Sequence, residues 1–84
     1  MSDRAYIMIN VMPGLTSSVV KALGQIKAIK TIDPCWGKPD IIVIADVADQ
    51  DALTQLVLNA IHGIEGVTQT DTHLFYRSPE SKAK

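Results

Sequence analysis

The stretch Gly37-Lys38-Pro39-Asp40-Ile41-Ile42-Val43-Ile44-Ala45 joins a polar turn to a continuous run of apolar, mostly β-branched residues. The run Ile41–Ala45 is typical of a buried β-strand. The residues before the turn, from Ala28 to Trp36, alternate well enough to form the partner strand. The stretch therefore predicts a β-hairpin, because glycine and polar residues are what a tight turn between two strands needs.

The same turn is a candidate binding site. Gly37 lets a ligand approach the backbone, Lys38 supplies a cation and Asp40 supplies a carboxylate. These groups match the two charges of a zwitterion such as an amino acid. The alternative is an ordinary tight turn in which the Asp40 side chain caps its own backbone. The four turn residues alone leave both interpretations open.

The pattern outward from this hairpin predicts six elements. In chain order they are a strand over 5–12, a helix over 16–24 capped by Thr16, Ser17 or Ser18, strands over 28–36 and 40–47, a helix capped by Asp49 or Asp51 and reaching Ile64, and a strand over 67–76. The order βαββαβ is that of the ferredoxin-like α+β fold, with two helices on one face of a four-stranded antiparallel sheet. Right-handed crossovers place the first and third strands in the centre. Pro34 then lies on an edge strand, where its missing N–H does no harm.

The sheet face opposite the helices is expected to be apolar. We predict that Tyr6, Met8, Leu74 and Tyr76 form an interface on that face. A small domain gains stability by covering such a patch, so the chain is expected to dimerise through its sheets with isologous contacts, as an α/β-barrel-like dimer. The alternative is the ordinary scatter of apolar residues over a protein surface.

Composition excludes several classes of protein. The chain has 84 residues, a net charge of −1 and one cysteine, Cys35. One cysteine allows no internal disulfide and favours an intracellular setting. Cys35, His62 and His73 lack the spacing of metal ligands, so neither a metal nor a cofactor is expected. Without a clustered basic footprint, a signal peptide or a membrane-length apolar stretch, we expect a cytoplasmic protein that contacts no nucleic acid and no membrane.

The expected domain spans residues 1–77, and the polar residues 78–84 are expected to form a disordered tail. An enzyme of the same small α+β type is the first rival. Asp71 and His73 share a face of the last strand and can form a hydrogen bond, but no activated nucleophile accompanies them. We therefore expect no catalytic residues, and Cys35 is expected to pack as a small apolar side chain.

Three motifs together give the chain a family resemblance. They are Ala5-Tyr6-Ile7-Met8-Ile9 followed by Pro13-Gly14, the turn Gly37-Lys38-Pro39-Asp40, and Gly66-Val67-Thr68-Gln69-Thr70-Asp71-Thr72. The chain resembles the effector-binding (RAM) domain of the Lrp/AsnC family over residues 5–77. The last two motifs resemble the family's G-x-x-D turn and its G-V-x-x-T-x-T strand. With no room for a helix-turn-helix domain, the chain looks like a stand-alone RAM protein involved in transcription regulation.

The resemblance implies partners and a site. It implies dimers, rings of four dimers and a small amino-acid-like effector bound between dimers. Gly37, Lys38 and Asp40 are then the first ligand-binding candidates, with Trp36, Thr70 and Thr72 behind them. Lys38, Pro39 and Trp36 depart from the family's usual residues, so the effector is not named. The rival is an assembly module that binds no ligand and oligomerises alone or with full-length Lrp/AsnC regulators.

Overall fold

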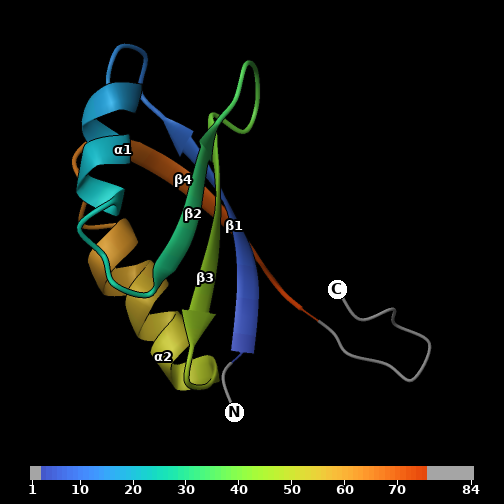
Figure 1. The fold of residues 1–84 in the computed structure, drawn as a ribbon. Helices are drawn as coiled ribbons and strands as arrows, with labels where there is room; N and C mark the ends of the chain where they lie inside the picture. The colour runs from blue at the N-terminus through green and yellow to red at the C-terminus, as the bar shows by residue number, and fades with distance from the viewer. Residues whose placement is uncertain (1–2, 76–84) are drawn as a thin grey trace.

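Four antiparallel strands form one sheet, and the helices lie together on one side of it (Figure 1). The computed structural model describes residues 3–75. Its elements are β1 (Asp3–Val11), α1 (Thr16–Leu23), β2 (Ile29–Pro34), β3 (Ile41–Val47), α2 (Gln50–Gln55), the π-helical continuation η1 (Leu56–Ile61) and β4 (Val67–Leu74). This architecture confirms the predicted ferredoxin-like α+β fold.

The strands are arranged in the order β2-β3-β1-β4. The first and third strands therefore occupy the centre, as predicted, and Pro34 lies on the edge strand β2. Ile7 of β1 is opposite Val43 of β3 on one side and Thr72 of β4 on the other. Residues directly opposite one another share a face, so this register decides which side chains meet the helices.

The core lies between the sheet and the helices. Alternate residues of β1 and β3, among them Ile7, Ile9 and Val43, are completely buried there, because successive strand residues point to opposite faces. The helices add the buried residues Val19, Leu23, Leu53, Leu56 and Ile61. Burying one such side chain contributes about 1.5–3 kcal/mol, so this single layer is the main source of stability.

The two helices begin differently. The prediction that Asp49 or Asp51 caps the second helix is confirmed for Asp49, whose Oδ1 accepts a hydrogen bond from Ala52 N at 2.8 Å. The predicted cap of the first helix is wrong. The N-cap residue is Leu15, which makes no side-chain cap, because the helix already includes Thr16. Leu15 instead packs against the core.

The helix-free face of the sheet, called the open face below, carries Tyr6 and Met8 as expected. Leu74 does not join them. It is opposite Ala5, on the helix-covered face, and packs against the core, so the sequence analysis placed its side chain on the wrong face. Phe75 contacts Tyr6 instead, with ring centroids 4.5 Å apart. Tyr76 and residues 78–84 lie outside the described residues.

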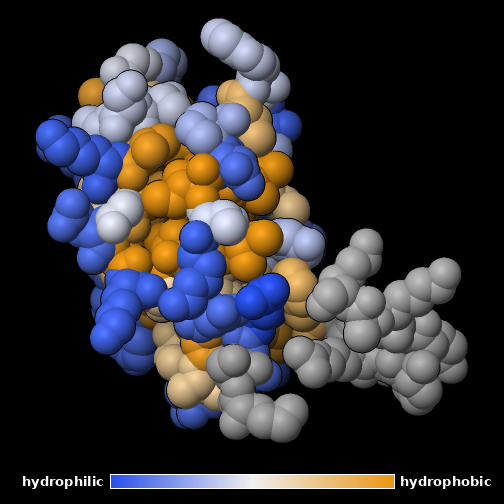
Figure 2. Space-filling view, viewed as in Figure 1, coloured by the Kyte–Doolittle hydropathy of each residue, from blue (hydrophilic) through white to orange (hydrophobic). Residues whose placement is uncertain are grey.

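Figure 2 shows apolar atoms gathered over the middle of β2 and β3, with hydrophilic residues around them. The β2–β3 hairpin carries partly buried apolar side chains on both of its faces. They are Ile29 and Ile32 of β2 and Ile42 and Ile44 of β3. Among residues 3–75, no helix has the length and apolarity needed to cross a membrane.

Candidate functional site

The turn Trp36–Asp40 projects from the end of the β2–β3 hairpin (Figure 1). Two backbone hydrogen bonds attach its base to the sheet: Cys35 N donates to Asp40 O at 2.7 Å, and Asp40 N donates to Ile9 O at 3.1 Å. Gly37 has a φ of +100°, a conformation that other residues rarely adopt. The turn is therefore fixed by its backbone, which leaves its side chains free for other contacts.

The Asp40 carboxylate holds the turn to the neighbouring strand. Its Oδ2 accepts a hydrogen bond from Val11 N at 2.7 Å and lies 3.7 Å from Lys38 Nζ. The side chain thus caps the end of β1 and not the backbone of its own turn. Both contacts use Oδ2, so among the described residues Oδ1 remains available as an acceptor.

Lys38 and Trp36 both extend into solvent. The Lys38 side chain is 76% exposed, so its ammonium group can move away from Asp40 at little cost. Trp36 is fully exposed. Exposure of a whole indole is unusual, because tryptophan is highly buried on average. Trp36 therefore fills no pocket formed by residues 3–75, and its full apolar surface is open to solvent.

Asn10 is a site residue that the sequence analysis missed. Its Oδ1 is buried and has no hydrogen-bond partner among the described residues. Asn10 lies between Ile9 and Val11, whose backbone groups both bond to Asp40. A buried oxygen without a donor costs free energy, so Asn10 is a candidate for a contact with a ligand or a water molecule. In the sequence, Asn10 was only one more polar residue on the outward side of a strand.

The predicted ligand-binding residues Thr70 and Thr72 do not lie at the turn Trp36–Asp40. Thr70 and Thr72 are opposite Ile9 and Ile7, which places both on the helix-covered face of β4. Thr70 Oγ1 is 2.8 Å from His62 Nε2. Within one chain the structure therefore brings Gly37, Lys38 and Asp40 together, with Trp36 beside them, but it does not bring Thr72 to that turn.

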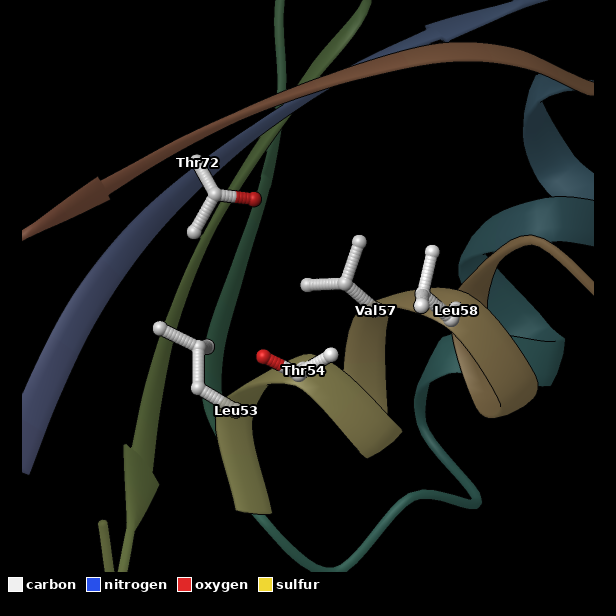
Figure 3. Close-up of a pocket in the computed structure, with 5 residues that line it drawn as sticks. All are labelled: Leu53, Thr54, Val57, Leu58 and Thr72. Carbon is white, nitrogen blue, oxygen red and sulfur yellow. The ribbon is translucent and has the colours of Figure 1, made fainter. Parts of the chain in front are cut away.

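Thr72 lines a separate groove at the opposite edge of the sheet, between β4 and the second helix. Figure 3 shows Thr72 on the strand side of this groove and the helical residues across from it. The groove, with a volume of about 270 Å³, is lined by Leu53, Thr54, Val57, Leu58 and Thr72. Leu58 is 61% exposed, a signal that the helical spacing of the sequence alone did not single out.

The described residues give little support to catalysis. The predicted hydrogen bond between Asp71 and His73 is confirmed at 3.2 Å, but both side chains are more than half exposed. The Cys35 thiol donates to Asp33 O at 3.4 Å. Within residues 3–75, no three His, Cys, Asp or Glu side chains are grouped closely enough to hold a metal ion.

Comparisons with solved structures show the same fold in several proteins. TTHA0845 from Thermus thermophilus has a TM-score of 0.85 and 21% identity, and the match covers 90% of this chain and 95% of that one. E. coli AsnC has a TM-score of 0.85 and 18% identity, over 98% of this chain and 56% of AsnC. A Neisseria meningitidis transcriptional regulator in complex with L-Met, NMB0573, has a TM-score of 0.82 and 14% identity, over 94% and 53%.

The chain thus spans nearly all of one similar structure and about half of the other two. A search of curated protein sequences found no significant match. The family model described as "Lrp/AsnC ligand binding domain" matches residues 4–83, nearly the whole chain. The chain therefore belongs to the Lrp/AsnC ligand-binding domain family, whose members are regulatory domains of transcription regulators.

Proposed function

We propose that this chain senses an amino acid through the turn Trp36–Asp40 and responds by changing its assembly. The observation that carries the proposal is the pairing of two features at one end of the sheet. A turn there holds a mobile cation and a carboxylate, Lys38 and Asp40, and a buried oxygen of Asn10 has no donor within residues 3–75. A free amino acid has the complementary charges and donors.

Each end of the ligand has its own partners in this proposal. The ligand ammonium group donates to Oδ1 of Asp40 and to Oδ1 of Asn10. The ligand carboxylate binds Lys38 Nζ and backbone N–H groups beside Gly37, where the described residues leave open space on the side a Cβ would occupy. Charge-assisted hydrogen bonds of this kind are about twice as strong as neutral ones, which suits recognition at an exposed turn.

Assembly is the second half of the proposal. The open face, with Tyr6, Met8 and Phe75, packs against the same face of a second copy to form an isologous dimer. Dimers then join into a ring, and full-length Lrp/AsnC regulators can enter the same assemblies. The net charge of −1 favours action through protein contacts over direct contact with DNA. The similar Neisseria regulator is in complex with L-Met, which supports an amino acid as the ligand class.

A thermal-shift screen against the twenty amino acids tests the sensing role. A ligand that binds the folded chain stabilises it by RT ln(1 + [L]/Kd), so the effector raises the Tm at high concentration. The matched control is Asp40→Asn, which keeps an oxygen acceptor for Val11 N but loses the negative charge. We expect this variant to fold and to lose most of the shift. An undiminished shift would remove Asp40 from the site.

The second candidate function is an assembly module without a ligand. The fully exposed Trp36 and the apolar side chains of Tyr6 and Phe75 on the open face favour it, because these side chains serve protein contacts without any effector. If none of the twenty amino acids raises the Tm while light scattering shows dimers or larger rings, this second function holds and the sensing role is wrong.

A further inference from the structure

We infer that Trp36 of one dimer inserts into the groove between β4 and the second helix of a neighbouring dimer. This inference rests on the proposed assembly into rings and names the contact that closes them. Trp36 is a fully exposed indole on the turn that follows the edge strand β2, and the groove is an open apolar cavity beside the other edge strand, β4. The occupant is therefore a second copy of this chain.

The volume of the groove suits the size of the Trp36 side chain. The groove has a volume of about 270 Å³. This is just below the roughly 300 Å³ at which pockets begin to hold drug-sized ligands, so it suits one large side chain. Its walls offer the aliphatic carbons of Leu53, Val57 and Leu58, with the hydroxyl groups of Thr54 and Thr72 at hand for the indole N–H (Figure 3).

The charged residues near Trp36 and near the groove also have opposite signs. Lys38 is two residues from Trp36 and is mostly exposed. Asp51 is exposed and lies three residues before Thr54 on α2, so it shares the helix face that borders the groove. Insertion of Trp36 therefore brings the cation of one chain toward the carboxylate of the next.

The geometry decides which kind of assembly results. A knob at one edge and a groove at the other form a heterologous contact, and such contacts close into rings when the rotation allows. One tryptophan buries only about 150–250 Å², while a stable interface buries about 1,200–2,000 Å². The contact is therefore an anchor within a ring of sheet-packed dimers, where repetition adds avidity.

The arrangement also joins the two halves of the site that one chain keeps apart. Thr72 is remote from the turn in its own chain but lines the groove that receives the neighbour's Trp36. An effector bound at Lys38 and Asp40 then lies beside this contact and can strengthen or weaken it. Ligand binding and ring closure are thereby coupled.

Trp36 itself reports the insertion, because it is the only tryptophan in the chain. With rising protein concentration, with and without a mixture of the amino acids other than tryptophan, we expect the fluorescence of wild type to shift to shorter wavelength and to resist quenching by iodide. Leu58→Glu should retain the fold, since Leu58 is exposed, and should stay dimeric with an exposed indole. Ser18→Glu, exposed and remote on α1, is the charge-matched control and should assemble like wild type.

A mixing experiment separates this contact from others. Trp36→Ala retains the groove and lacks the knob, and Leu58→Glu retains the knob and lacks the groove. Neither should form rings alone, but their mixture should form larger particles by light scattering. If rings formed instead by stacking of two Trp36 side chains, the mixture would not form larger particles. Failure of the mixture to form larger particles would therefore overturn the inference.

The outcome for the Trp36 contact can be distinguished from the outcome for the proposed amino-acid sensing. A buried Trp36 without any amino-acid thermal shift supports the inference and refutes the effector. If Trp36 stays exposed at every concentration, with or without amino acids, the inference is wrong. The proposed binding of an amino-acid effector is not affected by that result. If Leu58→Glu removes an amino-acid shift while Trp36 stays exposed, the groove is a ligand pocket and the inference is wrong.

Discussion

The carboxylate of Asp40 accepts a hydrogen bond from the backbone N–H of Val11 at 2.7 Å, across 29 positions of the chain. This contact ties the turn of the β2–β3 hairpin to the last residue of β1. Asp40 is thus structural before any ligand is present. Its role in stability has to be measured separately from its role in binding.

Replacing Asp40 by alanine should lower the free energy of unfolding by about 1–3 kcal/mol, because the part-buried N–H of Val11 loses its acceptor. Asp40→Asn should recover most of that loss. Chemical denaturation of the three proteins measures the difference. Equal stability of Asp40→Ala and wild type would show that the N–H finds another acceptor.

The open face should govern dimerisation. Tyr6→Asp places a charge beside Phe75, where the rings lie 4.5 Å apart, and should convert dimers to monomers. Lys21→Asp, on the exposed side of α1, is the control that changes charge without touching the sheet. Size-exclusion chromatography with light scattering distinguishes the species. Dimers of Tyr6→Asp as tight as wild type would place the interface elsewhere.

Leu74, the last residue of β4, and Phe75, which follows it, should respond in opposite ways. Leu74 packs against the core, so Leu74→Ala should cost about 1–3 kcal/mol in unfolding free energy, less than for a fully buried leucine. Phe75→Ala should cost less in the monomer and should mainly weaken the dimer. Denaturation at low concentration and light scattering at high concentration separate the two effects. The reverse result would restore Leu74 to the interface.

The ion pair of Arg4 and Asp46 should give the fold an acid-sensitive contribution. The hydrogen bond from Arg4, reinforced by its charge and by that of Lys30, lowers the pKa of Asp46 below its ordinary value of 3.8. The stabilisation is therefore complete above pH 3.8 and is lost as the pH falls through the lower folded-state pKa.

Asp46→Asn should accordingly lower the Tm slightly at neutral pH and flatten its fall in acid, the effect being small because the pair is exposed. Arg4→Gln should produce the same flattening, since it removes the partner. Tm profiles from pH 2 to pH 7 provide the measurement. An acid dependence unchanged from wild type in both variants would show that the pair does not stabilise the fold.

Much of the fold could be predicted from the sequence because strands and helices repeat with different periods. The runs in β1 and β3, and Asp49 as a cap, are local signals and were identified correctly. The face of Leu74 could not be derived in this way. It depends on pairing with Ala5 of β1, which alternation within β4 does not specify.

The residues of the candidate site likewise differ in whether the sequence alone could predict them. Gly37, Lys38 and Asp40 form one motif, so their proximity follows from the sequence. Asn10 could be identified only from the packing, which buries its oxygen and leaves it without a donor in the part of the chain that the structure describes. The groove beside Thr72 likewise depends on how η1 is placed against β4, a long-range contact that no local pattern encodes.

The base of the turn is held through backbone atoms and one carboxylate, while positions 36, 38 and 39 place no side chain in the buried core. Trp36 is fully exposed and Lys38 is mostly exposed, so substitutions at these two positions should be nearly neutral for folding. The contacts that the turn offers to other molecules can therefore change at Trp36 and Lys38 without compensating changes in the core.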